Sequence, residues 1–92
     1  MAASDVTKKL KILNEKGLHA RAAAAFVKIA DSFDAQVYVE KDDLRVSGHS
    51  IMGLMMLGAA FQSEITVTCS GKDAQNALDA LEQLINDKFN EN

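Results

Sequence analysis

A histidine and an arginine lie two residues apart in a short stretch of the chain, residues 17–21 with the sequence GLHAR. A strand-like pattern ends before this stretch and a helical pattern begins after His19, so the imidazole is expected at a helix start. Unpaired backbone N–H groups and the positive end of the helix dipole favour an anion there, phosphate above all. Arg21 adds donors that match phosphate oxygens, and Gly17 permits the sharp turn that exposes the ring. The pattern predicts a nucleophilic histidine beside an anion site.

The same histidine has a plainer interpretation. A single histidine near a helix start is usually a cap or an ordinary surface residue, and short motifs often mislead. From the spacing of His19 and Arg21 alone, both interpretations stay open.

Composition and charge argue against several classes of protein. The 92 residues suffice for one domain, spanning residues 1–92, and the formal net charge of -3 argues against general nucleic-acid binding. No apolar run is long enough to insert into a membrane, and residues 1–9 lack the apolar centre of a secretion signal. A single cysteine cannot form an internal disulfide, which favours a reducing, cytoplasmic setting. His19, His49 and Cys69 lack the spacing of a metal site, and no cofactor is expected.

The first half of the chain alternates between strand and helix patterns. Residues 6–13 alternate in polarity as a strand does, and residues 20–32 follow the helical period. Residues 35–40 and 44–47 are expected to pair as a hairpin across a turn at 41–43. The expected buried stripe of the helix consists of Ala22, Ala25, Phe26, Ile29, Ala30 and Phe33.

A short helix is expected over residues 51–57, and it is apolar almost all the way round. Ser50 is a suitable N-cap for this helix, and Gly58 is a suitable stop. One face is expected in the core, and the rest is expected to form an adaptable contact surface, a role that suits methionine. The alternative is a short helix that is buried on every side.

The last third of the chain contains a strand and a helix. Residues 65–70 alternate regularly and place Cys69 on the buried side, as an inert core residue. Asp73 is a plausible cap for the final helix. The expected buried stripe of that helix is Ala74, Ala77, Leu78, Leu81, Leu84, Ile85 and Phe89. The order β-α-β-β-α-β-α predicts an α+β domain with helices on one face of an antiparallel sheet.

Three segments together resemble HPr, the family of histidine-containing phosphocarriers of the bacterial phosphoenolpyruvate phosphotransferase system. They are residues 17–21, residues 50–58 and residues 65–67, the last followed by Ser70-Gly71 and a C-terminal helix. They occur in the order and at the spacing of that family, and the resemblance covers nearly the whole chain. It implies an open-faced β-sandwich, in which three helices cover one face of a four-stranded antiparallel sheet.

The resemblance also implies roles for individual residues. His19 would accept a phosphoryl group on Nδ1 from phosphorylated enzyme I and pass it to a histidine of an EIIA-type protein, while Arg21 balances the phosphate charge. Ser50 matches a serine that an HPr kinase/phosphorylase modifies in some bacteria as a regulatory mark. The matches to the partner-binding surface are Ala20, Lys28, Ile51, Met52 and Met55.

Two positions depart from the family pattern. Ala22 stands where the family usually has proline, which removes a fixed backbone angle from the first helical turn. Asp31 stands where many sugar-transport members have a basic residue, and these features resemble the nitrogen-related, regulatory members. His49 precedes Ser50 and could bind phosphate or a kinase, but a solvated loop histidine is the favoured interpretation.

Two other functions compete with that of a phosphocarrier, which asks only for a monomer. In the first, the chain is a regulatory binding module, switched when a phosphate on Ser50 repels an acidic partner. In the second, the chain is an enzyme. The sequence offers no general acid–base pair, metal set or activated nucleophile for this, so we expect a substrate of other enzymes rather than an enzyme.

Overall fold

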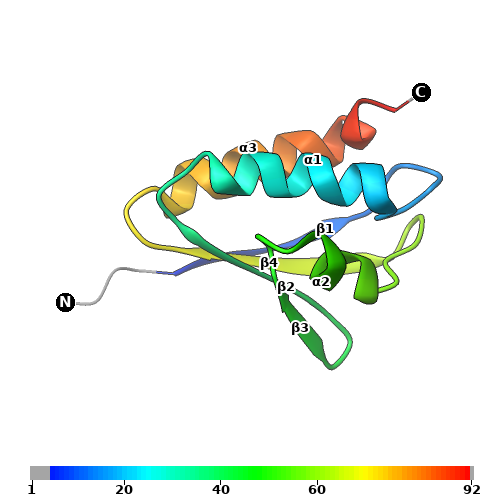
Figure 1. The fold of residues 1–92 in the computed structure, drawn as a ribbon, viewed down its shortest axis with the longest axis horizontal. Helices are drawn as coiled ribbons and strands as arrows, with labels where there is room; N and C mark the ends of the chain where they lie inside the picture. Colours follow the sequence, from blue (N-terminus) through cyan, green and yellow to red (C-terminus); the bar gives the residue numbers. More distant parts are fainter. Residues whose placement is uncertain (1–4, 92) are drawn as a thin grey trace.

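The computed structural model describes residues 5–91, whose four strands form one antiparallel sheet in the order β1-β4-β2-β3 (Figure 1). The strands are β1 (Val6–Lys11), β2 (Gln36–Lys41), β3 (Leu44–Ser47) and β4 (Glu64–Ser70). The helices are α1 (Ala20–Asp31), α2 (Ile51–Met56) and α3 (Ala74–Asn86), followed by the short 3-10 turn η1 (Lys88–Asn90). The predicted order of elements and the open-faced α+β sandwich are confirmed.

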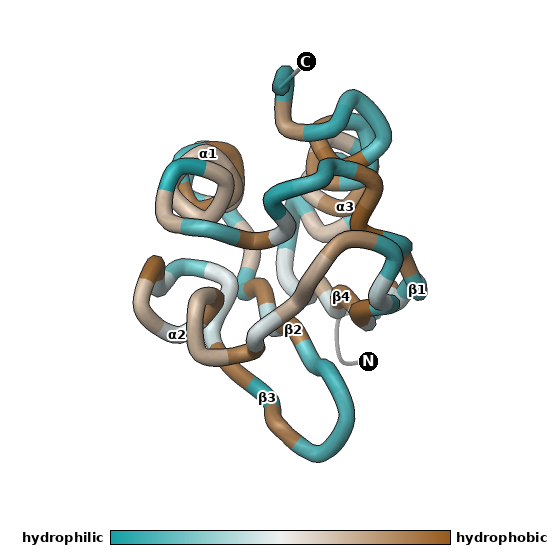
Figure 2. Tube along the Cα trace, turned by 90° about the vertical axis from the view of Figure 1, so that its right-hand side faces the viewer, coloured by the Kyte–Doolittle hydropathy of each residue, from teal (hydrophilic) through white to brown (hydrophobic). Residues whose placement is uncertain are grey.

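The helices and the sheet enclose one apolar core. α1 and α3 lie side by side over the sheet, and α2 packs against α1 and β3 (Figure 1, Figure 2). Strand pairing places Val39 opposite Val67 and Leu10 opposite Ile65, so side chains of alternate residues meet beneath the helices. The buried strand residues are Leu10, Val37, Val39, Ile65, Val67 and Cys69.

The helical stripes follow the prediction with one addition. All seven residues predicted for α3 and its extension are buried. In the stripe predicted for α1, Ala22, Phe26 and Ala30 are buried. Ala25, Ile29 and Phe33, the last of which follows the end of α1, are partly buried and pack against the core. Ala23 is buried as well, because α1 touches both α2 and α3 and therefore hides a wider arc than one stripe.

The Cys69 side chain lies wholly in this core. Burial raises the pKa of its thiol to about 11, so very little reactive thiolate exists at neutral pH. The prediction that Cys69 is an inert core residue is confirmed.

The element ends differ slightly from the predicted ones. β1 ends at Lys11 rather than at residue 13, because the chain turns there: Ile12 donates its N–H to the Ser63 carbonyl (2.9 Å) and accepts from the Gln62 N–H (2.7 Å). α1 and α2 each end one residue earlier than predicted.

The short helix α2 is capped as predicted and exposed on one side. The Ser50 hydroxyl accepts a hydrogen bond from the Gly53 N–H at 2.9 Å. Leu54 is fully buried, but Met52 is 76% exposed and Met56 is 69% exposed. The alternative of a helix buried on every side is therefore wrong.

Asp73 precedes α3, but its side chain does not cap the helix, contrary to prediction. Its carboxylate instead accepts the Asp34 N–H (2.9 Å), and its own N–H donates to the Asp34 carbonyl (3.0 Å). This reciprocal pair joins the loop after α1 to the loop before α3. The carboxylate that the local pattern predicted as a helix cap therefore makes a tertiary contact instead.

Two expectations concern secretion and membranes. The expected lack of a secretion signal rests on residues 1–9, of which residues 1–4 lie outside the described part of the chain. No helix within residues 5–91 has both the length and the apolar character needed to cross a bilayer.

Candidate functional site

His19 lies at the start of α1, as the sequence predicts. Its backbone is extended (φ -78°, ψ 179°), and its carbonyl accepts the Ala23 N–H at 2.8 Å, which begins the helix. Its side chain makes no capping hydrogen bond, so the imidazole leaves the first-turn N–H groups uncovered. The side chain is 26% exposed, which leaves it open to a partner.

A tight turn before His19 fixes where the ring lies. Gly17 adopts a φ of 68°, and a Cβ atom there would lie 2.5 Å from the Ala59 carbonyl oxygen. The next residue, Leu18, is buried and donates its N–H to that same oxygen at 2.8 Å. A larger residue than glycine would push this turn away from the segment after α2, so glycine is required here.

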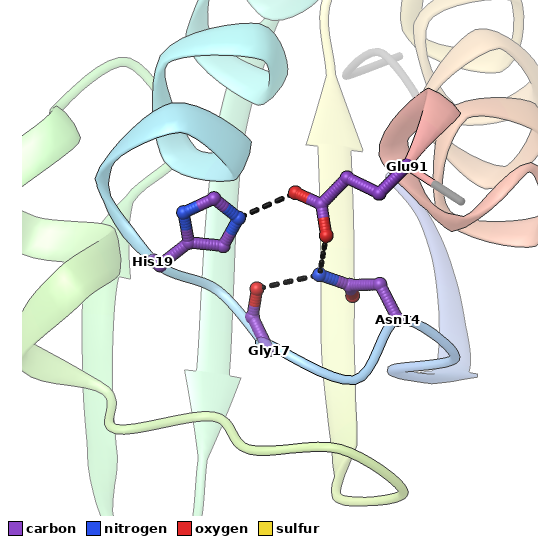
Figure 3. Close-up of polar contacts among 4 residues, drawn as sticks. All are labelled: Asn14, Gly17, His19 and Glu91. Carbon is purple, nitrogen blue, oxygen red and sulfur yellow. Dashed lines mark hydrogen bonds and ion pairs between the residues drawn. The ribbon is translucent and has the colours of Figure 1, made fainter.

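The ring of His19 contacts a residue from the other end of the chain. Its Nε2 atom makes a short hydrogen bond with a carboxylate oxygen of Glu91. The second carboxylate oxygen accepts a hydrogen bond from the Asn14 side-chain amide at 3.0 Å, and that amide also donates to the Gly17 carbonyl at 2.7 Å (Figure 3). Asn14 is only 2% exposed, so this chain of contacts starts from the core and ends on the imidazole.

The environment of Glu91 favours its ionised form. The hydrogen bond with His19 lowers the pKa of the carboxyl group, and the Asn14 amide and the charges of His19 and Lys16 lower it further. Desolvation by burial acts in the opposite direction and is outweighed. Glu91 is therefore a carboxylate at neutral pH.

A left-handed turn brings Glu91 to the ring. Lys88, Phe89 and Asn90 have φ values of 56°, 55° and 61°, a conformation that costs roughly 1 kcal/mol or more for each residue with a side chain. Phe89 is buried and anchors the turn against the core. Beyond this turn, the Glu91 side chain reaches His19 at the start of α1 (Figure 3).

Arg21 lies close to this contact but is not part of it. The residue is exposed and lines a shallow depression of about 310 Å³ together with Lys16, Phe89 and Glu91. Its guanidinium has no hydrogen bond or ion pair with any residue in the range 5–91. Its donors are thus uncommitted to the described part of the chain and are available to an anion at the helix start.

His49 is a partly exposed loop histidine, as the favoured interpretation has it, and its ring also contacts a carboxylate. Its Nδ1 atom lies 2.6 Å from a carboxylate oxygen of Asp31, at the end of α1. The backbone N–H of His49 donates to the Ser47 hydroxyl at 3.1 Å. The pair joins the end of α1 to the turn that leads to Ser50.

Exposed apolar side chains gather on α2 and just after it. The five residues predicted for partner binding are all exposed: Ala20, Lys28, Ile51, Met52 and Met55. Met56 (69% exposed) and Phe61 (46% exposed) extend this set and were not among the predicted contacts. α2 packs beside α1 (Figure 2), so we call these seven side chains the docking surface. An apolar surface beside a reactive side chain is typical of a protein-binding site.

Sequence reasoning proposed His19, Arg21 and Ser50 as candidates and did not consider Asn14 or Glu91. Asn14 lies in a polar break and looks like an ordinary turn residue. Glu91 lies 72 positions from His19, and no local pattern connects the two. Within residues 5–91, no cluster of three or more metal-ligating side chains is present.

Comparison with known proteins agrees with the geometry. The family described as "PTS HPr component phosphorylation site" matches residues 6–87. Phosphocarrier protein HPr of Neisseria meningitidis is 48% identical over 82 residues, 89% of this chain and 92% of that protein. Phosphocarrier protein NPr of Shewanella violacea is 38% identical over 84 residues, 91% of this chain and 92% of the other.

A solved structure supports the same assignment. HPr-C-His from Thermoanaerobacter tengcongensis superposes with a TM-score of 0.88 at 43% identity, covering 97% of this chain and 98% of the other. Both the sequence and the fold are therefore shared over nearly the whole length. The chain belongs to the HPr family of phosphocarrier proteins of the phosphotransferase system.

Proposed function

We propose that this chain carries a phosphoryl group on Nδ1 of His19 between two proteins of a phosphotransferase system. The observation that carries the proposal is the state of the ring, whose Nε2 is engaged by Glu91 while Nδ1 lies on the side away from it (Figure 3). The uncapped N–H groups of α1 begin beside this ring, and Arg21 lines a depression together with Glu91, so both favour an anion here.

The transfer needs no chemistry from this chain beyond the imidazole. The Nδ1 lone pair attacks the phosphorus of a donor phosphohistidine and forms a new N–P bond. The donor's N–P bond breaks, and its electron pair returns to the donor nitrogen. The proton on Nε2 of His19 stays in place, so the phosphorylated ring carries a positive charge. Passing the group to an acceptor histidine repeats these changes with His19 as the donor.

The proposed donor is phosphorylated enzyme I, and the proposed acceptor is an EIIA-type protein, as membership of the family implies. Each partner would contact the docking surface, so that two histidines meet in line for the transfer. The chain acts as a substrate of these proteins rather than as an enzyme, and one copy of one domain supplies all that the exchange requires. Its proposed setting is the cytoplasm, where these partners work.

Ser50 is proposed as the regulatory position, modified by an HPr kinase/phosphorylase. Its hydroxyl caps α2, and a phosphate at a helix start keeps an oxygen that can accept the Gly53 N–H. The added charge would lie at the start of the helix that carries Met52 and Met55. It would weaken the binding of an acidic partner surface, which also supports a second candidate function as a regulatory binding module.

The mass of the intact protein after incubation with enzyme I, Mg²⁺ and phosphoenolpyruvate tests the proposal. We expect the gain of one acid-labile phosphoryl group, and no gain in the variant His19→Ala. His19 is partly exposed and does not cap α1 with its side chain, so this variant should remain folded. Phosphoryl uptake by folded His19→Ala would contradict the assignment, and so would no uptake by the wild-type chain.

A binding experiment separates the carrier from the regulatory module. Loss of phosphoryl transfer in His19→Ala with partner binding intact is expected of a carrier. A partner that binds His19→Ala normally, fails to bind Ser50→Asp, and never exchanges phosphate would favour the module instead.

A further inference from the structure

We propose that Glu91 is a positioning residue of this carrier, whose carboxylate keeps the proton on Nε2 of His19 and so leaves Nδ1 as the nucleophile. The inference rests on the proposed function. It states that Glu91, at the C-terminal end of the described chain, determines which nitrogen of His19 accepts the phosphoryl group. Glu91 itself does not touch the phosphoryl group, since it contacts the opposite side of the imidazole (Figure 3).

The carboxylate is held at two points, which makes its position definite. One oxygen contacts Nε2 of His19, and the other accepts from the Asn14 amide nitrogen at 3.0 Å. The amide orientation of Asn14 is settled by its two partners, because the Glu91 oxygen and the Gly17 carbonyl are both acceptors. Since Asn14 is buried, Glu91 is attached to a rigid part of the molecule rather than to solvent-exposed chain.

An ionised carboxylate can only accept hydrogen bonds, and this fixes the proton on the ring. Glu91 is ionised at neutral pH because its hydrogen bonds lower the pKa of its carboxyl group. The nitrogen in contact with it must therefore carry the hydrogen, which in neutral imidazole leaves the lone pair on Nδ1. Without Glu91 the ring could rotate and exchange between its two tautomers.

The same carboxylate acts on the phosphorylated ring. Phosphoryl transfer to Nδ1 leaves a positive charge on the imidazole, and a carboxylate on Nε2 stabilises that charge. A ring protonated on Nε2 is also the better leaving group when the phosphoryl group moves on. Glu91 therefore supports both the uptake and the release of the phosphoryl group.

Other charged groups lie near Glu91, so the test of its role needs a control for the loss of charge. Lys16 and Arg21 lie with Glu91 around one depression, and Lys88 lies with it around another of about 280 Å³. Glu15 lines both depressions but makes no hydrogen bond with His19. Glu15→Gln is therefore a matched control, since it removes one negative charge from the same neighbourhood and leaves the contact intact.

Nuclear magnetic resonance of the ring tests the contact without phosphorylation. In the wild-type chain and in Glu15→Gln, we expect the Nε2 proton of His19 to exchange slowly with water and the nitrogen shifts to report a single tautomer. In Glu91→Ala, we expect fast exchange and a mixture of tautomers. The same nitrogen shifts and exchange rate in wild type and Glu91→Ala would overturn the proposal.

The kinetics of phosphoryl uptake test the positioning role. For Glu91→Ala and Glu91→Gln we expect uptake from phosphorylated enzyme I to slow about tenfold. Melting curves should show that both variants remain folded, because the contact joins two side chains that are partly exposed. Rates equal to those of Glu15→Gln would overturn the role of Glu91 alone. No uptake by the wild-type chain would overturn the proposed function instead.

Discussion

The two histidines of the chain use opposite ring nitrogens. Glu91 engages Nε2 of His19, whereas Asp31 engages Nδ1 of His49. His19 therefore presents Nδ1 beside the start of a helix, and His49 keeps the same nitrogen in an ion pair at the end of that helix. Similar pairing with a carboxylate thus has different consequences for the two rings, and in the proposed function only His19 accepts the phosphoryl group.

Replacement of His49 tests this distinction. His49→Ala should leave phosphoryl uptake unchanged, because it removes no group near His19. It should lower the free energy of unfolding by less than about 1 kcal/mol, since partly exposed ion pairs contribute little. Mass spectrometry after phosphorylation and urea unfolding measure the two quantities. A large loss of uptake in a folded His49→Ala chain would contradict the assignment.

Arg21 offers a second test at the scale of one residue. Its guanidinium is exposed and has no partner within residues 5–91, so Arg21→Ala should not change the melting temperature. A charged hydrogen bond to phosphate contributes about 1.5–3 kcal/mol, so we expect uptake to slow roughly tenfold or more. Lys72→Ala is the control, because it removes the same charge from the loop before α3. Equal rates in the two variants would show that Arg21 has no specific role.

At the scale of elements, Ser50 caps α2 and is also the proposed regulatory position. Ser50→Ala removes the acceptor for the Gly53 N–H and should lower the free energy of unfolding by about 1 kcal/mol. Ser50→Asp should keep the cap, because aspartate is a good N-cap, while adding charge at the start of α2. We expect Ser50→Asp to be as stable as the wild-type chain in urea and to bind enzyme I more weakly in calorimetry. Equal affinity for both would argue against regulation at Ser50.

The order of elements was predictable because each one follows its own local period. α3 shows this best, since all seven residues of its predicted stripe are buried. Asp73 shows where local reasoning fails: the side chain that could cap α3 is bound by the Asp34 N–H from a distant loop. The left-handed turn at residues 88–90 was equally hidden, since nothing about a lysine or a phenylalanine favours a positive φ.

At the scale of the whole molecule, only part of the candidate site could be predicted from the sequence. His19 and Arg21 could be proposed as candidates from the sequence because they belong to one short motif at a helix start. Glu91 was not, because its contact with His19 joins positions 72 residues apart and depends on how α1 and α3 pack. Only the folded chain brings the two together.

The stabilising effect of the contact between Glu91 and His19 should depend on pH. Because the folded state lowers the pKa of Glu91, its carboxylate stabilises the fold above its ordinary value of 4.5 and loses that effect as the pH falls through the lowered value. The difference in unfolding free energy between wild type and Glu91→Gln should therefore be largest at neutral pH and shrink towards zero as the pH falls from 4.5 through the lowered pKa. Urea unfolding across this range measures it. A difference that stays constant with pH would mean that Glu91 does not titrate with folding.

The reciprocal pair of Asp34 and Asp73 lies at the end of α1 that is farthest from His19 (Figure 1). With 12 residues, α1 separates the two ends by about 18 Å, more than twice the Debye length of about 8 Å at physiological ionic strength. A protein approaching His19 is therefore electrostatically insulated from the far loops. Those loops can accumulate charge changes over evolution, or carry a fluorescent dye on Lys72, without altering how fast partners find the histidine.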